Sequence, residues 1–392
     1  MSVIAISGNA SGTGVFTIAS PATNTNRTLT LPDAAGTVLF TDGAGAVADI
    51  KSINSAPLLH QNDIINGDFR IAQAGTSFAA PAAGAYDLDG WLNGNTTAVA
   101  VFTVEQVAGS TAGRLARQVT ITTADATVDA GDVVNDSTRT EGYNIEKYVG
   151  QTFTVAFRAK VPVAGIHCVA LRNIDGAAAD MRSYVKEINF PTANVWQDCS
   201  FTVVGGLPTA GVWNYTAGVG LQITFAHMCG TTYQTTPDAW NTGNFLATAN
   251  QVNDCATVGN VWAMEKVTLN LGTVAAVSEI SVEQELLRCR RYYRVSAHML
   301  PGRWISSTVC RFWAFFDTPM RAAPTSSLSA AAFAVEDPGV ASYDATAASI
   351  TATGGDNSGV FIQITATYAG APAALTIAQM NTAGAITFAA RL

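Results

Sequence analysis

The sequence predicts an all-β protein with a short leading β segment, a jelly-roll β-sandwich, one connecting helix and a smaller C-terminal β-sandwich domain. Apolar and polar residues alternate along many short segments, Gly, Pro and Asn clusters separate these segments, and helical periodicity is confined to one stretch. At 392 residues the chain has room for more than one domain. We expect the leading segment over residues 1–60, β domains over 61–280 and 297–392, and the connecting helix over 281–296.

The leading segment, residues 1–60, is rich in Gly, Ala, Ser and Thr and holds only short apolar alternations. These predict short strands joined by Gly and Pro-Asp turns. Such a segment cannot bury enough apolar surface to fold alone. We expect it to fold on copies of itself or on another protein, as an attachment segment.

Just after the leading segment, Asn66-Gly67 predicts a hairpin or strand-entry turn, because both residues tolerate positive φ.

Residues 61–280 alternate with a period of two, which predicts strands with one face in a core. The expected inward residues of two such strands are Phe153, Val155, Phe157 and Ala159, and Leu221, Ile223 and Phe225. His227 continues the second of these faces, so we expect a hydrogen-bonded core histidine.

The one predicted helix spans residues 281–295 and begins with a capping box, Ser281 with Gln284. Its apolar stripe comprises Val282, Leu286, Cys289 and Tyr293. The arginines near its end, Arg288, Arg290, Arg291 and Arg294, are expected to pair with acidic neighbours, although they could also bind an anionic glycan or a phosphate.

The last domain, residues 297–392, returns to alternation, as in Ile362, Ile364, Ala366 and Tyr368. We expect Trp304 and Trp313 in its core.

Charged residues make up only 13% of the chain while hydrophobic residues make up 48%. So few charges would leave a monomer poorly covered, so we expect an oligomer. The net charge of −8 and the lack of a basic stripe argue against nucleic-acid binding. We expect no membrane insertion and no secretory signal, hence synthesis in a cytoplasm.

The six cysteines have no metal-ligating spacing, so we expect free buried thiols, with a buried disulfide as the alternative. The acidic run containing Asp125, Asp129, Asp132 and Asp136 could be a calcium loop or a solvated polar loop. The solvated loop is favoured because the spacing lacks the alternation of an EF-hand. We therefore expect no metal and no cofactor.

The sequence contains no catalytic motif of the common hydrolase, nucleotide-binding or metalloprotease types. Asp87 and Asp89 could form the carboxylate pair of a glycoside hydrolase, but a surface turn is the favoured interpretation. Four loop aromatics among short polar residues suit stacking on sugars, or else they plug the ends of the sandwich. These candidate glycan-binding residues are Trp213, Tyr215, Tyr233 and Trp240.

The stretch NDIINGDFRIAQAGTSF (62–78), followed by AYDLDGW (85–91), resembles the entry to a jelly-roll module of bacteriophage tail-fibre and receptor-binding proteins. In the same order, YNIEKYVGQTFTVAFRAK (143–160) resembles its central strand, TYQTTPDAWNTGN (232–244) its aromatic loop and EQELLRCRRYYR (283–294) its closing helix. The leading residues are similar to the strand repeats that attach phage fibres. The sequence MEKVTLNLGTVA (264–275) departs from the pattern of that family at Lys266 and Thr268.

The resemblance implies a virion tail component, a homotrimer that attaches to the tail or baseplate through residues 1–60 and meets a host-surface glycan with its β domains. We expect no enzymatic activity. A tail-associated glycan depolymerase is one alternative, and a purely structural baseplate, collar or capsid decoration protein is another.

Overall fold

A computed structural model of the chain describes residues 52–53, 56–57, 62–273, 280–296, 300–328, 333–337, 341–368, 377–380 and 386–392. The chain forms two compact units, Met1–Leu58 and Leu59–Leu392. In the first unit, β1 (Ser52–Ile53) pairs with β2 (Ala56–Pro57). The rest of the expected attachment segment lies outside the described residues.

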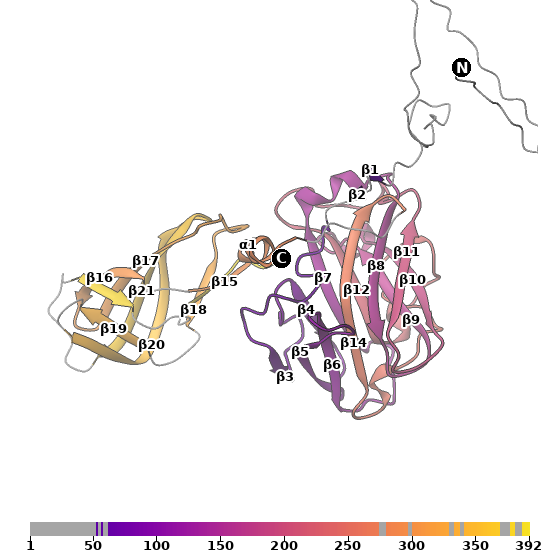
Figure 1. Ribbon diagram of the computed structural model, residues 1–392, viewed down its shortest axis with the longest axis horizontal. Helices are drawn as coiled ribbons and strands as arrows, with labels where there is room; N and C mark the ends of the chain where they lie inside the picture. Colours follow the sequence, from indigo (N-terminus) through magenta and orange to yellow (C-terminus); the bar gives the residue numbers. More distant parts are fainter. Residues whose placement is uncertain are drawn as a thin grey trace, which may run out of the picture. The chain divides into compact units, whose positions relative to one another are not determined.

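The second unit contains a sandwich of two six-stranded antiparallel sheets (Figure 1). The first sheet consists, in spatial order, of β13 (Trp240–Thr242), β10 (Arg182–Phe190), β9 (Gly165–Arg172), β12 (Val219–Cys229), β7 (Val133–Glu141) and β4 (Trp91–Asn95). The second sheet consists of β11 (Gln197–Val203), β8 (Phe153–Lys160), β14 (Val261–Leu271), β6 (Leu115–Thr123), β5 (Val101–Ala108) and β3 (Ser77–Ala79). The predicted all-β class and its jelly-roll sandwich are confirmed.

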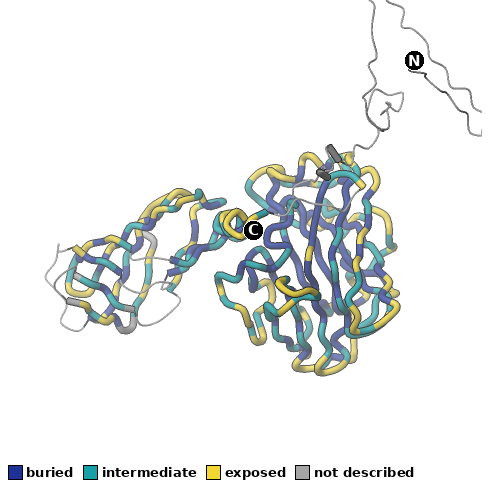
Figure 2. Tube along the Cα trace, viewed as in Figure 1, coloured by how far each residue is buried: buried dark blue, intermediate teal, exposed yellow. Residues whose placement is uncertain are grey.

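The sandwich core follows the alternation of the sequence. Both runs predicted to face inward, on β8 and β12, are buried and belong to one apolar cluster. Figure 2 shows the buried residues along the sandwich strands. All six cysteines are buried and free, as expected, and act as small apolar residues.

The segment that enters the sandwich turns without forming a hairpin. Asn66 adopts the predicted positive φ of 53°, and the Asn66 side chain bonds the backbone of Ile71 and Asp89. The following residues run as a loop beside β14, where the Val267 amide donates to the Gly67 carbonyl over 2.8 Å. Ile64 and Phe69 are buried in the sandwich core, but they belong to this loop and not to a strand. The first strand of the sandwich is β3, which begins ten residues after Gly67.

The helix α1 (Val282–Arg290) carries the predicted capping box but ends earlier than predicted. Residues 293–295 form a strand, β15 (Tyr293–Val295), which pairs with β23 (Ile386–Ala389). The aromatic and β-branched residues of this segment favour a strand, and the pairing supplies the hydrogen bonds that a longer helix would have made internally. Val282, predicted to pack, is instead exposed. On its other side, β23 pairs with β18 (Thr325–Leu328).

The last strands close into a barrel and do not form the second sandwich that we expected. In order around the barrel they are β16 (Pro301–Ser306), β17 (Val309–Phe315), β21 (Gly359–Tyr368), β20 (Ala341–Gly355), β19 (Phe333–Asp337) and β22 (Ile377–Met380). Alternation is the same in a sandwich and a barrel, so it does not distinguish them. The long β20 has two register shifts where it pairs with β21, and such bulges bend a strand and permit closure.

Candidate functional site

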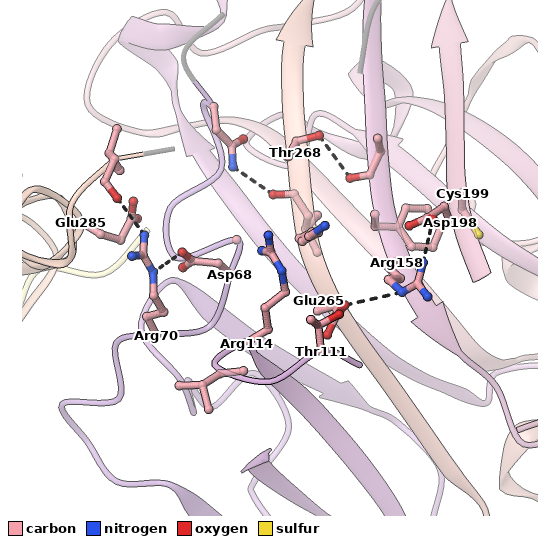
Figure 3. Close-up of a pocket in the computed structure, with 18 of the residues that line it drawn as sticks. Asp68, Arg70, Thr111, Arg114, Arg158, Asp198, Cys199, Glu265, Thr268 and Glu285 are labelled. Carbon is pink, nitrogen blue, oxygen red and sulfur yellow. Dashed lines mark hydrogen bonds and ion pairs between the residues drawn. The ribbon is translucent and has the colours of Figure 1, made fainter. Parts of the chain in front are cut away.

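A groove of about 780 Å³ lies on the outer face of the second sheet of the sandwich (Figure 3). Its floor includes Ala156 and Arg158 of β8 and Ser200 of β11, which alternate with core residues of the same strands. Its walls come from the entering loop, the β5–β6 turn and the helix α1. This volume is in the range of sites that enclose small ligands.

The groove gathers charge in a chain that has little of it. Nine of the 22 residues that line it are charged, against 13% of the whole chain. They are Asp68, Arg70, Arg114, Arg158, Asp198, Glu265, Lys266, Glu285 and Arg288. The five basic and four acidic side chains nearly balance. The groove therefore offers both hydrogen-bond donors and acceptors without a strong net charge.

A β-bulge builds the middle of the groove. The pairing of β14 with β8 shifts between Glu265 and Thr268, and the intervening Lys266 has a positive φ of 54°. The Lys266 side chain is exposed, whereas Glu265 is buried and accepts from the Ser110 backbone amide at 2.7 Å. The bulge thus aims a cation into the groove beside a fixed carboxylate.

Arg158 lies between two carboxylates on the floor, as Figure 3 shows. Its Nη1 atom is 2.6 Å from Asp198 Oδ2, and its Nε atom is 3.6 Å from Glu265 Oε1. Asp198 is largely exposed and Glu265 is buried. Arg158 Nε donates to the Ser110 hydroxyl at 3.1 Å, and that hydroxyl donates to Glu265, so Ser110 bridges the cation to the buried carboxylate.

The opposite wall joins the helix to the entering loop. Arg288 donates to the Glu285 carboxylate at 3.1 Å and to the Asn62 carbonyl at 2.9 Å, and the Asn66 amide also donates to Glu285. Burial raises the pKa of Glu285 despite Arg288 beside it. Arg70 pairs with Asp68 and donates to the Ile280 carbonyl at 3.0 Å. These contacts hold the wall in place before any ligand arrives.

The four predicted glycan-binding aromatics do not line this groove. The indole rings of Trp213 and Trp240 pack edge to face with their centroids 5.7 Å apart, and each indole N–H donates to a backbone carbonyl. These two residues pack on the sandwich core, as the alternative interpretation of plugs at the ends of the sandwich predicted. Tyr233 packs on a second apolar cluster, and Tyr215 is 40% exposed. Contact between these residues and a glycan stays a prediction.

The two carboxylates considered for hydrolysis are buried and do not form the expected surface turn. Asp87 accepts from Arg117 at 2.9 and 2.6 Å, and both side chains are fully buried. Asp89 accepts from the Gln73 backbone amide at 2.7 Å and from the Gln73 side chain, and burial raises the pKa of Asp89. Neither carboxylate faces the groove.

Arg117 also contacts Asp136, so a buried ionic network joins the two sheets. His227 Nε2 lies 2.8 Å from Asp136 Oδ2, which confirms the predicted core histidine. Burial opposes the charged imidazole, but the Asp136 carboxylate outweighs it and raises the pKa of His227 to about 9. A further carboxylate, Asp254, lies 3.2 Å from the buried His167.

The acidic run considered for calcium is divided between two environments. Asp136 belongs to the buried network, whereas Asp129 and Asp132 lie in an exposed loop, with the Asp129 amide donating to Asp132 at 2.8 Å. Within the described part of the chain, no three His, Cys, Asp or Glu side chains are placed to hold a metal ion. None of the described helices is long and apolar enough to cross a membrane.

The arginines at the end of the helix pair with acidic side chains, as predicted. Arg288 pairs with Glu285, Arg291 with Glu141 at 2.7 Å, and Arg290 with Asp317 at 2.9 Å. Arg294 pairs with Asp317 as well. Only Arg288 lines the groove.

Sequence reasoning missed the groove because its residues come from six separate segments. A weak signal was available in MEKVTLNL (264–271), where Lys266 interrupts an otherwise alternating strand. No pattern in the sequence indicates that this interruption would face Arg158 and Asp198.

No protein-family model matches the sequence, and no curated protein sequence matches it. Among solved structures, one described as "CBM4 structure and function" is 17% identical, with 53% of this chain and 99% of that chain covered at a TM-score of 0.30. The family 11 carbohydrate-binding module of the Clostridium thermocellum cellulase Lic26A-Cel5E is 10% identical, with coverages of 52% and 98% and a TM-score of 0.28. The enzymatically active domain of tailspike protein 4 of bacteriophage CBA120 is 15% identical, with coverages of 54% and 21% and a TM-score of 0.28. The assignment of a function therefore depends on the residues of this chain.

Proposed function

We propose that this chain is a non-enzymatic glycan-binding component of a bacteriophage tail fibre and that the groove on the second sheet holds the glycan. One observation carries the proposal: a chain that is 13% charged concentrates nine charged side chains of both signs along one groove. Sugars present many hydroxyls that donate and accept, so they need fixed partners of both kinds. The near balance of charge favours a neutral saccharide at this surface.

The groove suits binding because its polar groups are already ordered. Arg158 is held by Asp198 and Glu265, and Arg288 is held by Glu285 and the Asn62 carbonyl. Side chains that are fixed in advance lose little entropy when a ligand binds. Several weak contacts of this kind become strong attachment when a fibre presents several copies.

Blocking the groove tests the proposal. Ala156 is half-buried on the floor, so Ala156→Trp should fill the groove without entering the core. Binding to an array of neutral gluco-, galacto- and manno-oligosaccharides should fall roughly tenfold or more. The matched control is Val204→Trp, because Val204 is 83% exposed and does not line the groove. Equal binding by both variants would remove the groove from the proposal.

A tail-associated glycan depolymerase is the second candidate, and one observation favours it. Asp198 and Glu265 flank the same guanidinium, that of Arg158, so two carboxylates stand near each other in a groove. Release of reducing ends from host polysaccharide that stops in Asp198→Asn would support an enzyme. We expect no release, since Arg158 occupies the space between the carboxylates.

The tail-fibre role rests on the resemblance of the sequence and on its low charge. We propose a homotrimer that attaches to a phage tail or baseplate through residues 1–60 and resides in the virion. Native mass measurement of the full chain should give three copies, and a single copy would contradict this. A purely structural baseplate, collar or capsid protein would not bind host cells in a pull-down.

A further inference from the structure

The outer face of the barrel carries large apolar side chains that the core does not use. On β17, Cys310, Phe312 and Ala314 are buried, whereas the residues between them point outward. Phe315 is 80% exposed, and Trp313, which we expected in the core, is half-buried on the outside. Trp304 alone of the two tryptophans is a core residue.

Neighbouring strands extend this face. Trp313 stands opposite Phe361 of β21, and the two rings lie edge to face with their centroids 6.1 Å apart. Phe361 is 46% exposed. We call this surface the barrel face and define it by Arg303, Arg311, Trp313, Phe315 and Phe361.

Two arginines border the rings. Arg303 of β16 stands directly opposite Arg311 of β17, and both are exposed. Like charges at opposed positions of an antiparallel pair destabilise it. Among the described residues neither arginine forms an ion pair, and Arg311 donates to the Gln363 side chain at 3.0 Å. An anion between Arg303 and Arg311 would remove the repulsion.

The exposed parts of Phe315 and Phe361 amount to roughly 200–300 Å², since aromatic side chains present about 150–250 Å² each. A stable dimer buries about 800 Å² on each partner. The apolar part of the barrel face is therefore small beside a dimer interface, and it is large enough for one or two sugar rings. Aromatic faces stack on the C–H faces of pyranoses, and guanidinium groups bind carboxylates in pairs of hydrogen bonds.

We propose that the barrel face is a second saccharide site, specific for an acidic sugar whose ring lies on Trp313, Phe315 and Phe361 and whose carboxylate binds Arg303 and Arg311. The inference rests on the proposed function only in assuming that the chain binds saccharides. It concerns a different surface and the opposite charge preference, because here the cations have no carboxylates beside them in the described structure.

Paired ligands test the charge preference on the full chain. The probes are oligogalacturonates, oligoguluronates and sialyl-oligosaccharides, each compared with its carboxyl-reduced form by titration calorimetry. We expect binding of at least one acidic probe and loss of roughly tenfold or more in affinity on carboxyl reduction. Binding of none of the acidic probes, or equal binding of both forms, would overturn the proposal.

Variants of exposed residues locate the site without disturbing the barrel. Trp313→Ala and Arg303→Gln should each reduce acidic binding roughly tenfold, and Phe315→Ser should reduce it less. The groove variant Ala156→Trp should leave acidic binding unchanged, and Trp313→Ala should leave neutral binding unchanged. The two proposals therefore fail independently: loss of the groove proposal would leave acidic binding at the barrel face unaffected, and loss of the barrel-face proposal would leave neutral binding in the groove unaffected. Unchanged acidic binding in Trp313→Ala, or a smaller oligomer in Phe315→Ser by ultracentrifugation, would overturn the assignment.

Discussion

The sandwich and the barrel place their charged side chains differently. The sandwich buries charge: Asp87, Arg117, Asp136 and His227 form a network between its two sheets. In the barrel, no charged residue is buried among the described residues from 300 onward, while Phe315 and other apolar side chains point outward. The two regions share the same alternating sequence pattern. They differ because the sandwich has charged side chains on its inner faces, whereas the barrel has large apolar side chains on its outer face.

The difference follows from whether each architecture can supply a partner for a buried charge. A buried charge needs a partner close by, and two facing sheets can supply one from each side, as Arg117 of β6 meets Asp136 of β7. The barrel core is filled by Trp304, Phe312 and other apolar residues. Among the described residues its charged side chains lie outside this core, together with the exposed rings of Phe315 and Phe361.

Breaking the network should have the largest effect. Arg117→Met leaves Asp87 and Asp136 buried without their cation, which should lower the free energy of unfolding of the sandwich by about 3–5 kcal/mol. The measurement is urea unfolding with peptide-resolved hydrogen exchange, which reports the sandwich and the barrel separately. Arg311→Met, an exposed change in the barrel, is the control. A loss of under about 1 kcal/mol for Arg117→Met would show that the network is dispensable.

Alkaline pH should weaken the same network more gently. The pKa of His227 is about 9 in the folded chain and about 6.5 when unfolded. Because the folded value is the higher one, the stabilisation is complete below about pH 6.5 and is lost as pH rises through 9, on the order of 1–3 kcal/mol. Hydrogen exchange of the sandwich at several pH values measures it. His227→Gln should remove this part of the pH dependence, and an unchanged profile in that variant would contradict the assignment.

The helix α1 lies between the two regions in the sequence. Its residues line the groove of the sandwich, whereas the following strand β15 pairs with β23, so weakening the helix cap tests which region depends on α1. Ser281→Ala removes the hydroxyl that accepts from the Gln284 amide at 3.2 Å and should cost about 1 kcal/mol of local stability. Exchange should rise in α1 and in the entering loop, and neutral-sugar binding should weaken slightly. Ser281→Asp retains a cap and should behave like the parent chain. Faster exchange in the barrel instead would mean that α1 supports that domain.

Local patterns predicted the parts of the fold that depend on neighbouring residues. The buried faces of β8 and β12 follow from a period of two, and the start of α1 follows from Ser281 and Gln284. Closure of the barrel depends instead on bulges in β20, which alternation does not reveal.

The two candidate sites were hidden for different reasons. The groove joins residues from Asn62 to Arg288, and only the folded sheet brings them together. On β17, Phe312 and Trp313 are adjacent and both large, so alternation assigns them to opposite faces without saying which face is inside. The buried neighbours Cys310 and Ala314 decide it, and the outward tryptophan becomes visible only in the structure.

The smallest effect on stability should come from the barrel face. Phe315→Ser replaces a side chain that is 80% exposed, so the free energy of unfolding of the barrel should change by less than about 0.5 kcal/mol. Trp304→Ala is the matched contrast, because its ring is fully buried and truncation should cost about 3–5 kcal/mol. Thermal and urea unfolding of the two variants measure the difference. If Phe315→Ser were as damaging as Trp304→Ala, the ring would be covered in solution, by a partner or by another part of the chain, and it could not be a free binding surface.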